Sequence, residues 1–167
     1  ADRSAFNENW GRPQNDGPAL RGMAMLKILP FLNDEYDSIA KKLVIPMIKN
    51  DVDYVSCNLE NHCFDLWEEK DGYHFYTRVV QCKFMKEATL YFYDNPSGHF
   101  DDDELLCMNI KFERLKELIK HHYDSLSVIS AFDLDGKEMH RDDASIMLAL
   151  SHSEYDVDII DKNVYFL

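Results

Sequence analysis

Long apolar runs, basic residues and clustered cysteines are all scarce in this sequence of 167 residues. No stretch of about 18 apolar residues occurs, and no charged segment followed by an apolar one opens the chain, so neither a transmembrane helix nor a signal peptide is visible. Lys and Arg number 18 against 31 Asp and Glu, which gives a formal net charge of -13. This excess of negative charge argues against phosphate backbones and anionic membranes, so no nucleic-acid or membrane partner is expected.

Cysteine and histidine spacing gives no metal-binding motif. There is no Cys-x-x-Cys pair and no neighbouring Cys/His set with the spacing of zinc ligands. Unpaired buried thiols are expected, although Cys57 and Cys63 could close a small loop. Surface or hydrogen-bonded histidines are likewise expected rather than metal ligands. We therefore expect no metal and no cofactor.

The apolar pattern of the first half predicts two helices. With 46% hydrophobic residues the chain can bury the core of one globular domain. After a polar stretch over 1–17, Pro18 suits the first turn of a helix over 19–32, whose apolar residues cover most of its surface and predict burial on several sides. Asp34 can cap a second helix that runs to about Ser56, with Pro46 as a kink.

Three further helices follow, over about 74–93, from the Asp101 run to about 122, and from Asp142 or Asp143 to about 152. The Asp run reads as a helix start rather than a metal site. Residues 57–72 read as a loop, and 126–136 alternate weakly before Asp135-Gly136, so a short strand or hairpin is possible there. Five helices with little or no sheet place the chain in the all-α class.

Three carboxylates surround one tryptophan in the predicted loop: Asp65, Glu68 and Glu69 flank Trp67. Clustered carboxylates repel one another, so at least one of the three is expected to hold its proton more tightly than an isolated glutamate, and an apolar indole acts in the same direction. A glycosidase keeps its general acid protonated in this way. A solvated turn with no chemistry explains the same residues on composition alone.

The sequence resembles fungal-type glucoamylases, glycoside hydrolase family fifteen, in three segments. Residues 9–21 (NWGRPQNDGPALR) are similar to the family's segment before a buried barrel helix, and 64–69 (FDLWEE) are similar to its general-acid motif. A looser match, 143–152 (DASIMLALSH), resembles a later helix whose leading Asp supports the site. The resemblance implies an (α/α)6 toroid of twelve helices, of which this chain would supply about five to six.

The resemblance also implies an activity, the removal of glucose from the non-reducing ends of α-1,4 and, more slowly, α-1,6 chains, with inversion and without a cofactor. Glu68 would be the general acid and Glu69 a substrate-binding carboxylate, while Asp65 would tune the acid and Trp67 would position it. An α-glucan or maltooligosaccharide would be the substrate.

Four residues outside this cluster receive implied roles. Trp10 would form an aromatic platform for a sugar beyond the cleavage point, and Arg12 and Asp16 would make polar contacts that hold the funnel loop. Arg141 is the candidate for the arginine that holds the sugar, although its spacing to Asp143 differs from the family's. Phe6 stands where the family usually has Tyr, so a hydroxyl hydrogen bond in the distal subsites is not expected.

The family's catalytic base and its Trp-x-Arg-Asp segment have no counterpart in residues 1–167. We therefore expect a central portion of a catalytic domain whose partners include the remaining portion of the toroid, and a chain that is inactive alone. The family is secreted or vacuolar/lysosomal, but no glycosylation sequon supports that location, because Pro96 follows Asn95.

Two alternatives stay open. One is a non-catalytic glucoamylase-like domain that binds glycan or serves regulation, and the other is an acidic helical interaction protein whose motifs are coincidental. Glucose release by the full gene product separates the first alternative from an enzyme. A large distance between the segment around Trp10 and Glu68 would favour the second.

Overall fold

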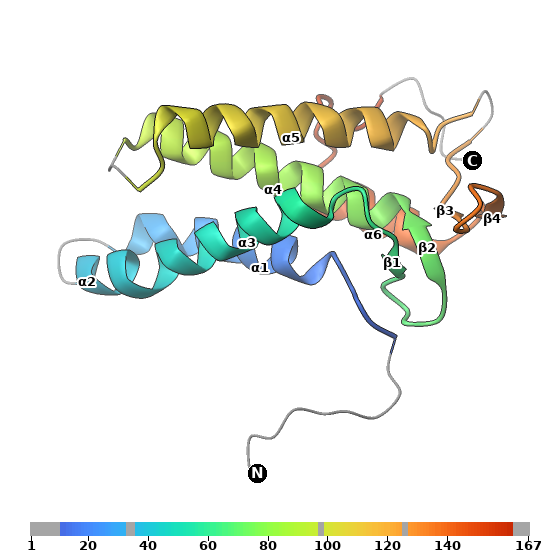
Figure 1. The fold of residues 1–167 in the computed structure, drawn as a ribbon, viewed down its shortest axis with the longest axis horizontal. Helices are drawn as coiled ribbons and strands as arrows, with labels where there is room; N and C mark the ends of the chain where they lie inside the picture. The colour runs from blue at the N-terminus through green and yellow to red at the C-terminus, as the bar shows by residue number, and fades with distance from the viewer. Residues whose placement is uncertain (1–10, 33–35, 97–98, 125–126, 162–167) are drawn as a thin grey trace, which may run out of the picture.

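The computed structural model describes residues 11–32, 36–96, 99–124 and 127–161, and in this part of the chain helices pack side by side with a small sheet at one end (Figure 1). Helix α4 (Phe75–Asp94) lies between α5 (Asp102–Lys120) on one side and α1 (Gly17–Ile28) on the other, and it also contacts α6 (Ala144–His152). Helix α3 (Ile45–Asn58) packs against α1. The all-α class with little sheet is confirmed.

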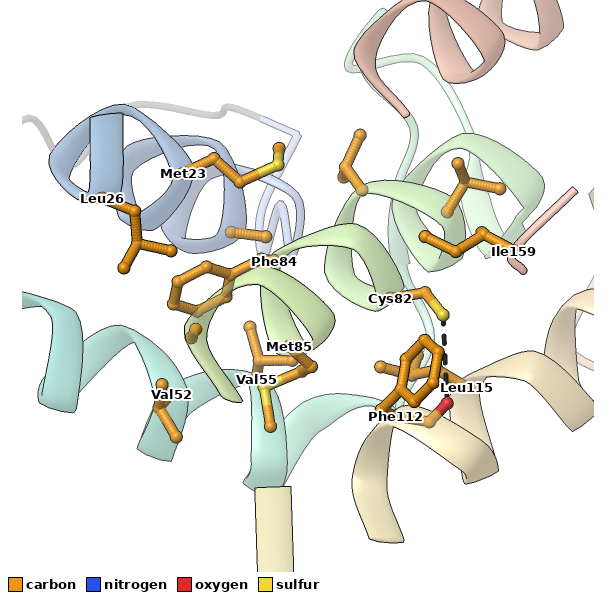
Figure 2. Close-up of a cluster of buried hydrophobic side chains, with 14 of the residues drawn as sticks. Met23, Leu26, Val52, Val55, Cys82, Phe84, Met85, Phe112, Leu115 and Ile159 are labelled. Atoms are coloured by element: carbon orange, nitrogen blue, oxygen red, sulfur yellow. Dashed lines mark hydrogen bonds between the residues drawn. The ribbon is translucent and has the colours of Figure 1, made fainter. Parts of the chain in front are cut away.

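The apolar core is centred on α4. Phe84 is fully buried, and its ring lies against Gly22 of α1, where an added Cβ would come within 2.2 Å of Phe84 Cε2 (Figure 2). Val52 and Val55 approach from α3, and Leu115 approaches from α5. Because protein interiors are close-packed, this glycine lets α1 and α4 approach without a void or an overlap.

Helix α1 is buried on fewer sides than its sequence predicts. Ala19, Met23 and Leu26 face the core, whereas Ile28 is exposed and Phe31, in the 3-10 turn η1 (Leu29–Phe31), is 78% exposed. The further neighbours that the predicted burial on several sides requires are not among the described elements. No described element covers that face, although its composition suits contact with another apolar surface.

The second predicted helix begins as α2 (Asp37–Ile39), passes through the π-helical segment η2 (Ala40–Val44) and continues as α3. Asp34, its predicted cap, lies outside the described residues. The irregularity predicted at Pro46 is present as π-helical turns immediately before it, consistent with a residue that lacks a backbone N–H.

Acidic N-caps begin the two later helices as predicted. The Asp101 side chain accepts a hydrogen bond from Glu104 N at 2.8 Å, and the Glu104 side chain accepts one from Asp101 N at 2.8 Å, which completes a capping box at α5. At α6 the Asp143 side chain accepts a hydrogen bond from Ser145 N at 2.7 Å. Of the two candidates, Asp142 and Asp143, the cap is therefore Asp143.

A four-stranded antiparallel sheet occupies the end of the molecule at which α4 and α6 begin (Figure 1). Its strand order is β1 (Cys63–Phe64), β2 (Asp71–His74), β3 (Ala131–Phe132) and β4 (Glu138–His140). The last two strands form the hairpin that the sequence allows. The prediction of a plain loop over 57–72 is wrong, because the two-residue strand β1 is too short to leave an alternating pattern.

The four cysteines are free thiols, Cys63 and Cys82 buried and Cys57 and Cys107 exposed. The prediction of unpaired thiols is thus confirmed, and the prediction that they are buried is wrong for Cys57 and Cys107. None of the described helices combines the length and the apolar character needed to cross a membrane.

Candidate functional site

Strands β1 and β2 are joined by the loop that carries the predicted acid, residues 65–70, called here the carboxylate loop. Asp65 N donates to Lys70 O at 2.9 Å and Glu68 N donates to Asp65 O at 3.0 Å, so the loop is a tight hydrogen-bonded turn. Glu68 has φ 63°, in the left-handed region that a residue with a Cβ adopts at a cost. Such strain persists where surrounding contacts hold it, and it marks this loop as a candidate site.

The Asp65 side chain holds the loop from inside. Its Oδ1 accepts hydrogen bonds from Glu69 N at 2.8 Å and from Lys70 N at 3.4 Å. Its backbone oxygen accepts a third from the Gln14 side chain at 3.0 Å. Asp65 is thus a carboxylate that organises the backbone on both sides of the candidate acid.

The segment before α1 supports the loop from outside. Phe64 N donates to Pro13 O at 2.8 Å. Gly11 lies so close that an added Cβ would come within 2.7 Å of Glu68 O. The first two matched segments therefore meet in space, with Arg12 exposed between these contacts. Trp10 lies outside the described residues.

Trp67 connects the loop to α6. Its indole is 46% exposed, and Nε1 donates to Asp143 Oδ1 at 3.2 Å. The same carboxylate caps α6, so one residue of the third segment fixes both the helix and the loop. Burial opposes ionisation of Asp143, but hydrogen bonds from Ser145 and Trp67 outweigh it, and the pKa of Asp143 is lowered.

The carboxylates of Glu68 and Glu69 have no hydrogen-bond or ion-pair partner within the described residues. Glu68 is partly buried and Glu69 is exposed. An unpartnered carboxyl group on a rigid turn is available to a ligand, because no internal bond must break before it can act.

Asp16 is buried, at 8% exposure, and is not the surface residue that its position in a polar segment suggests. Burial raises the pKa of Asp16, against hydrogen bonds from its own backbone and that of Gly17. His74 is also buried, and its Nε2 donates to Cys63 O at 2.8 Å. Burial lowers the pKa of His74, so the imidazole is neutral near pH 7.

A narrow pocket beside the carboxylate loop has a cavity volume of about 20 Å³, within a hollow of about 310 Å³ that includes open solvent. Among the described residues, Asp65 and Trp67 of the predicted site line it, and so does Asp143 of the third matched segment. The other lining residues are Leu66, Lys70, His74, Tyr76, Ser130, Ala131, His140 and Ser145. The pocket is therefore formed by the carboxylate loop, by strand β3 and by the first residues of helices α4 and α6. A concave site of this kind is the usual setting of a ligand site.

One pair within the lining, and a second pair that joins a lining residue to His152, were not predicted. Lys70 Nζ contacts His140 Nε2, which joins the carboxylate loop to β4. The Tyr76 hydroxyl lies 3.0 Å from His152 Nδ1, which joins α4 to α6, and burial raises the pKa of Tyr76 to about 12. Lys70 follows the acid motif directly, so the sequence offered a signal for it, whereas His140 reaches the pocket only through the pairing of β3 and β4.

Arg141 lies apart from this pocket. Its guanidinium donates to Glu138 at 2.5 and 2.6 Å and to Ser127 Oγ at 3.0 Å, and it also contacts Asp124. These partners raise the pKa of Arg141, Glu138 being the foremost. The structure brings Asp65, Trp67, Glu68 and the segment at Gly11 together, but it does not bring Arg141 to them.

Solved structures show the same fold. The chain superposes on a glucoamylase of Hormoconis resinae with a TM-score of 0.72 and 26% identity, covering 96% of this chain and 25% of that one. For the family 15 glucoamylase of Hypocrea jecorina the TM-score is 0.67 at 28% identity, over 76% of this chain and 21% of that one.

Sequence comparison agrees. A glucoamylase of Blastobotrys adeninivorans is 30% identical over 166 residues, which are 90% of this chain and 26% of that protein. Glucoamylase-1 of Arthroderma benhamiae is 47% identical over 89 residues, 52% of this chain and 14% of that protein. The chain thus spans about a quarter or less of these relatives. The sequence profile of Glycosyl hydrolases family 15 matches residues 1–164. This chain belongs to glycosyl hydrolase family 15.

Proposed function

We propose that the complete protein hydrolyses α-1,4 and, more slowly, α-1,6 glucosidic bonds of starch- or glycogen-type chains from the non-reducing end with inversion, and that this chain supplies the general acid, Glu68. The observation that carries the proposal is the carboxyl group of Glu68, which has no partner among the described residues and stands on a loop held from three sides. The three supports are Gly11, Asp65 and the Trp67–Asp143 hydrogen bond. Membership of the family and the glucoamylase names of the relatives support it.

The proposed reaction has two coupled proton transfers. Glu68 gives its proton to the glycosidic oxygen as the bond from that oxygen to the anomeric carbon breaks, and a water molecule attacks the same carbon from the opposite face. A second carboxylate takes the proton of that water, and in inverting enzymes it lies about 6.5–9.5 Å from the acid. We place that base in a part of the relatives that this chain does not span.

The neighbouring residues would act by position. Glu69, exposed beside the acid, would accept hydrogen bonds from sugar hydroxyls, and Trp67 and Asp65 would hold the acid in place. Trp10 would form a sugar platform, and Arg12 and Asp16 would hold the preceding segment. A sugar contact by Arg141 stays a prediction that the geometry does not favour, because Glu138, Asp124 and Ser127 engage its guanidinium.

The remaining portion of the toroid is the proposed structural partner of this chain. Its contact would fall on the face of α1 and η1 that carries Ile28 and Phe31, both exposed here. Large exposed apolar side chains that gather on one face mark an interaction surface.

Replacement of Glu68 by glutamine in the full gene product tests the acid. Glucose release from maltose and soluble starch is expected to fall by roughly 10²–10⁴-fold or more, because this is the range that general acid–base catalysis contributes. Saccharide binding, measured by calorimetry, should stay within a few-fold. Glu117→Gln, an exposed carboxylate on α5 paired with Lys120, is the matched control and should keep full activity.

Equal turnover by wild type and Glu68→Gln would refute the assignment of the acid. A wild-type gene product that binds maltose but releases no glucose would point instead to a non-catalytic glycan-binding or regulatory domain. A product that neither binds nor cleaves saccharide would overturn both.

A further inference from the structure

A second pocket lies on the outer side of the sheet and shares no residue with the pocket beside the carboxylate loop. It is lined by Tyr73 of β2, Arg78 of α4, His121 after α5, Phe132 of β3 and Gly136, and it holds about 620 Å³ with a wide opening to solvent. Its lining residues belong to β2, β3, the start of α4 and the turn after α5. None of the roles proposed above uses it.

Arg78 provides the positive charge of this pocket. Its Nη1 donates to Leu118 O at 3.2 Å and lies 2.9 Å from His122 Nε2. Within the described residues Nη2 and Nε have no hydrogen-bond partner, and Arg78 forms no ion pair with a carboxylate. The guanidinium therefore keeps one edge free, and two parallel N–H groups on such an edge match an oxyanion.

The surrounding groups leave this charge uncompensated. His122 is buried, its Nδ1 donates to Ile129 O at 2.6 Å, and its Nε2 therefore accepts from Arg78 as a neutral imidazole. Glu60 is the carboxylate that acts most strongly on Arg78, but Arg114 holds it through bonds of 2.5 and 3.0 Å. Burial lowers the pKa of Arg78 to about 10, the effect expected of a partly desolvated cation that lacks a counter-ion.

Aromatic rings form the walls around the guanidinium. Tyr73 and Phe132 are directly paired across β2 and β3, so their side chains lie on the same face of the sheet. The Arg78 guanidinium carbon lies 5.3 Å from the centre of the Tyr73 ring. Apolar rings around a few polar groups are typical of small-molecule pockets.

We infer that this pocket binds a small oxyanion attached to a ring, with a sugar phosphate as the fitting chemical class. The phosphate would take the free edge of Arg78, and the ring would pack against the exposed edges of Tyr73 and Phe132. His121, exposed at the rim, offers a further donor. The inference does not depend on the proposed hydrolysis, because it rests on other residues and another pocket.

Calorimetric titration of the purified chain with inorganic phosphate, glucose 6-phosphate and glucose tests the inference. Glucose 6-phosphate should bind more tightly than phosphate, and glucose should not bind at this pocket. Arg78→Gln should lower the affinity for phosphate and for glucose 6-phosphate by roughly tenfold or more, because hydrogen bonds to a charged group are lost. Arg78→Lys, which keeps the charge if it folds, should weaken them less.

Two further variants separate charge from shape. Lys41→Gln removes one positive charge from η2, where Lys41 pairs with Asp37, and it should leave both affinities within twofold. Tyr73→Leu should bring the affinity for glucose 6-phosphate close to that for phosphate. Wild-type binding of neither anion, equal binding by Arg78→Gln, or equal binding of glucose and glucose 6-phosphate would each overturn the inference.

Discussion

The helical core and the loop layer around the sheet are held together by different forces. Around α4 the contacts are apolar side chains such as Phe84, Met85 and Leu115, all fully buried. Around the carboxylate loop the contacts are single hydrogen bonds, among them Trp67 to Asp143 and Asp65 to Glu69 N. Apolar burial adds up over many atoms, whereas a hydrogen bond contributes about 0.5–1.5 kcal/mol net and fixes a direction. The helices therefore contribute most of the folding stability, and the hydrogen bonds of the loops fix the orientation of the candidate site residues.

Phe84→Ala should have the largest effect on stability. Phe84 belongs to α4, and its fully buried ring points toward α1 and α3 (Figure 2). Truncation of a buried Phe costs about 3–5 kcal/mol. The free energy of unfolding in urea measures the loss. In the same 167-residue chain, Phe31→Ala, at a position that is 78% exposed there, is the matched control and should change stability by about 0.5 kcal/mol or less. Similar losses in both variants would contradict the placement of the core.

Two glycines, one in each region, offer a second comparison. Gly22→Ala puts a Cβ into the Phe84 ring and should destabilise the chain by about 1–3 kcal/mol through overpacking. Gly11→Ala puts a Cβ against Glu68 O and, in a segment with few apolar contacts, should cost less. In the full gene product Gly11→Ala should instead lower kcat, because it displaces the loop of the proposed acid. A larger stability loss from Gly11→Ala than from Gly22→Ala would reverse the comparison.

The helical core could be predicted from the sequence, whereas much of the loop layer around the sheet could not. Periodic apolar residues predict all five helices, and Asp101 and Asp143 mark two of their starts, because capping and burial are local patterns. The buried position of Asp16 and the bond from Phe64 N to Pro13 O join residues more than forty positions apart, and no local pattern encodes them. Strand β1 pairs with the nearby β2, but two residues are too few to leave an alternating pattern. The motifs predicted that the segments near Gly11 and Glu68 would meet, but not that Lys70 would contact His140.

The two acidic N-caps distinguish a stabilising role from a positioning role. Asp101→Ala and Asp143→Ala each remove a cap, so each should lower the free energy of unfolding by about 0.5–2 kcal/mol. Only Asp143 also accepts the Trp67 indole N–H, so only Asp143→Ala should lower kcat of the full gene product, and Trp67→Phe should reproduce that loss without destabilising α6. Equal activity of the two cap variants would show that the Trp67–Asp143 bond does not position the acid.

His122 is a polar side chain buried within the apolar region. Its protonation should have the smallest of the predicted effects on the free energy of unfolding. Burial lowers the pKa of His122 from 6.5 to about 3, so below pH 6.5 the unfolded chain binds a proton that the folded chain does not. Stability should therefore fall with falling pH, by about 1 kcal/mol for this group between pH 6.5 and 5.5. Asp16, whose pKa is raised from 3.8, acts in the opposite direction and mainly at lower pH.

His122→Gln should reduce the slope of unfolding free energy against pH in that window, whatever its effect on absolute stability. Some slope should remain in His122→Gln, because the pKa of buried His74 is also lowered, and adding His74→Gln should remove most of the rest. If the slope is the same in wild type and His122→Gln, the imidazole takes up its proton within the fold, and Arg78 does not face a neutral acceptor.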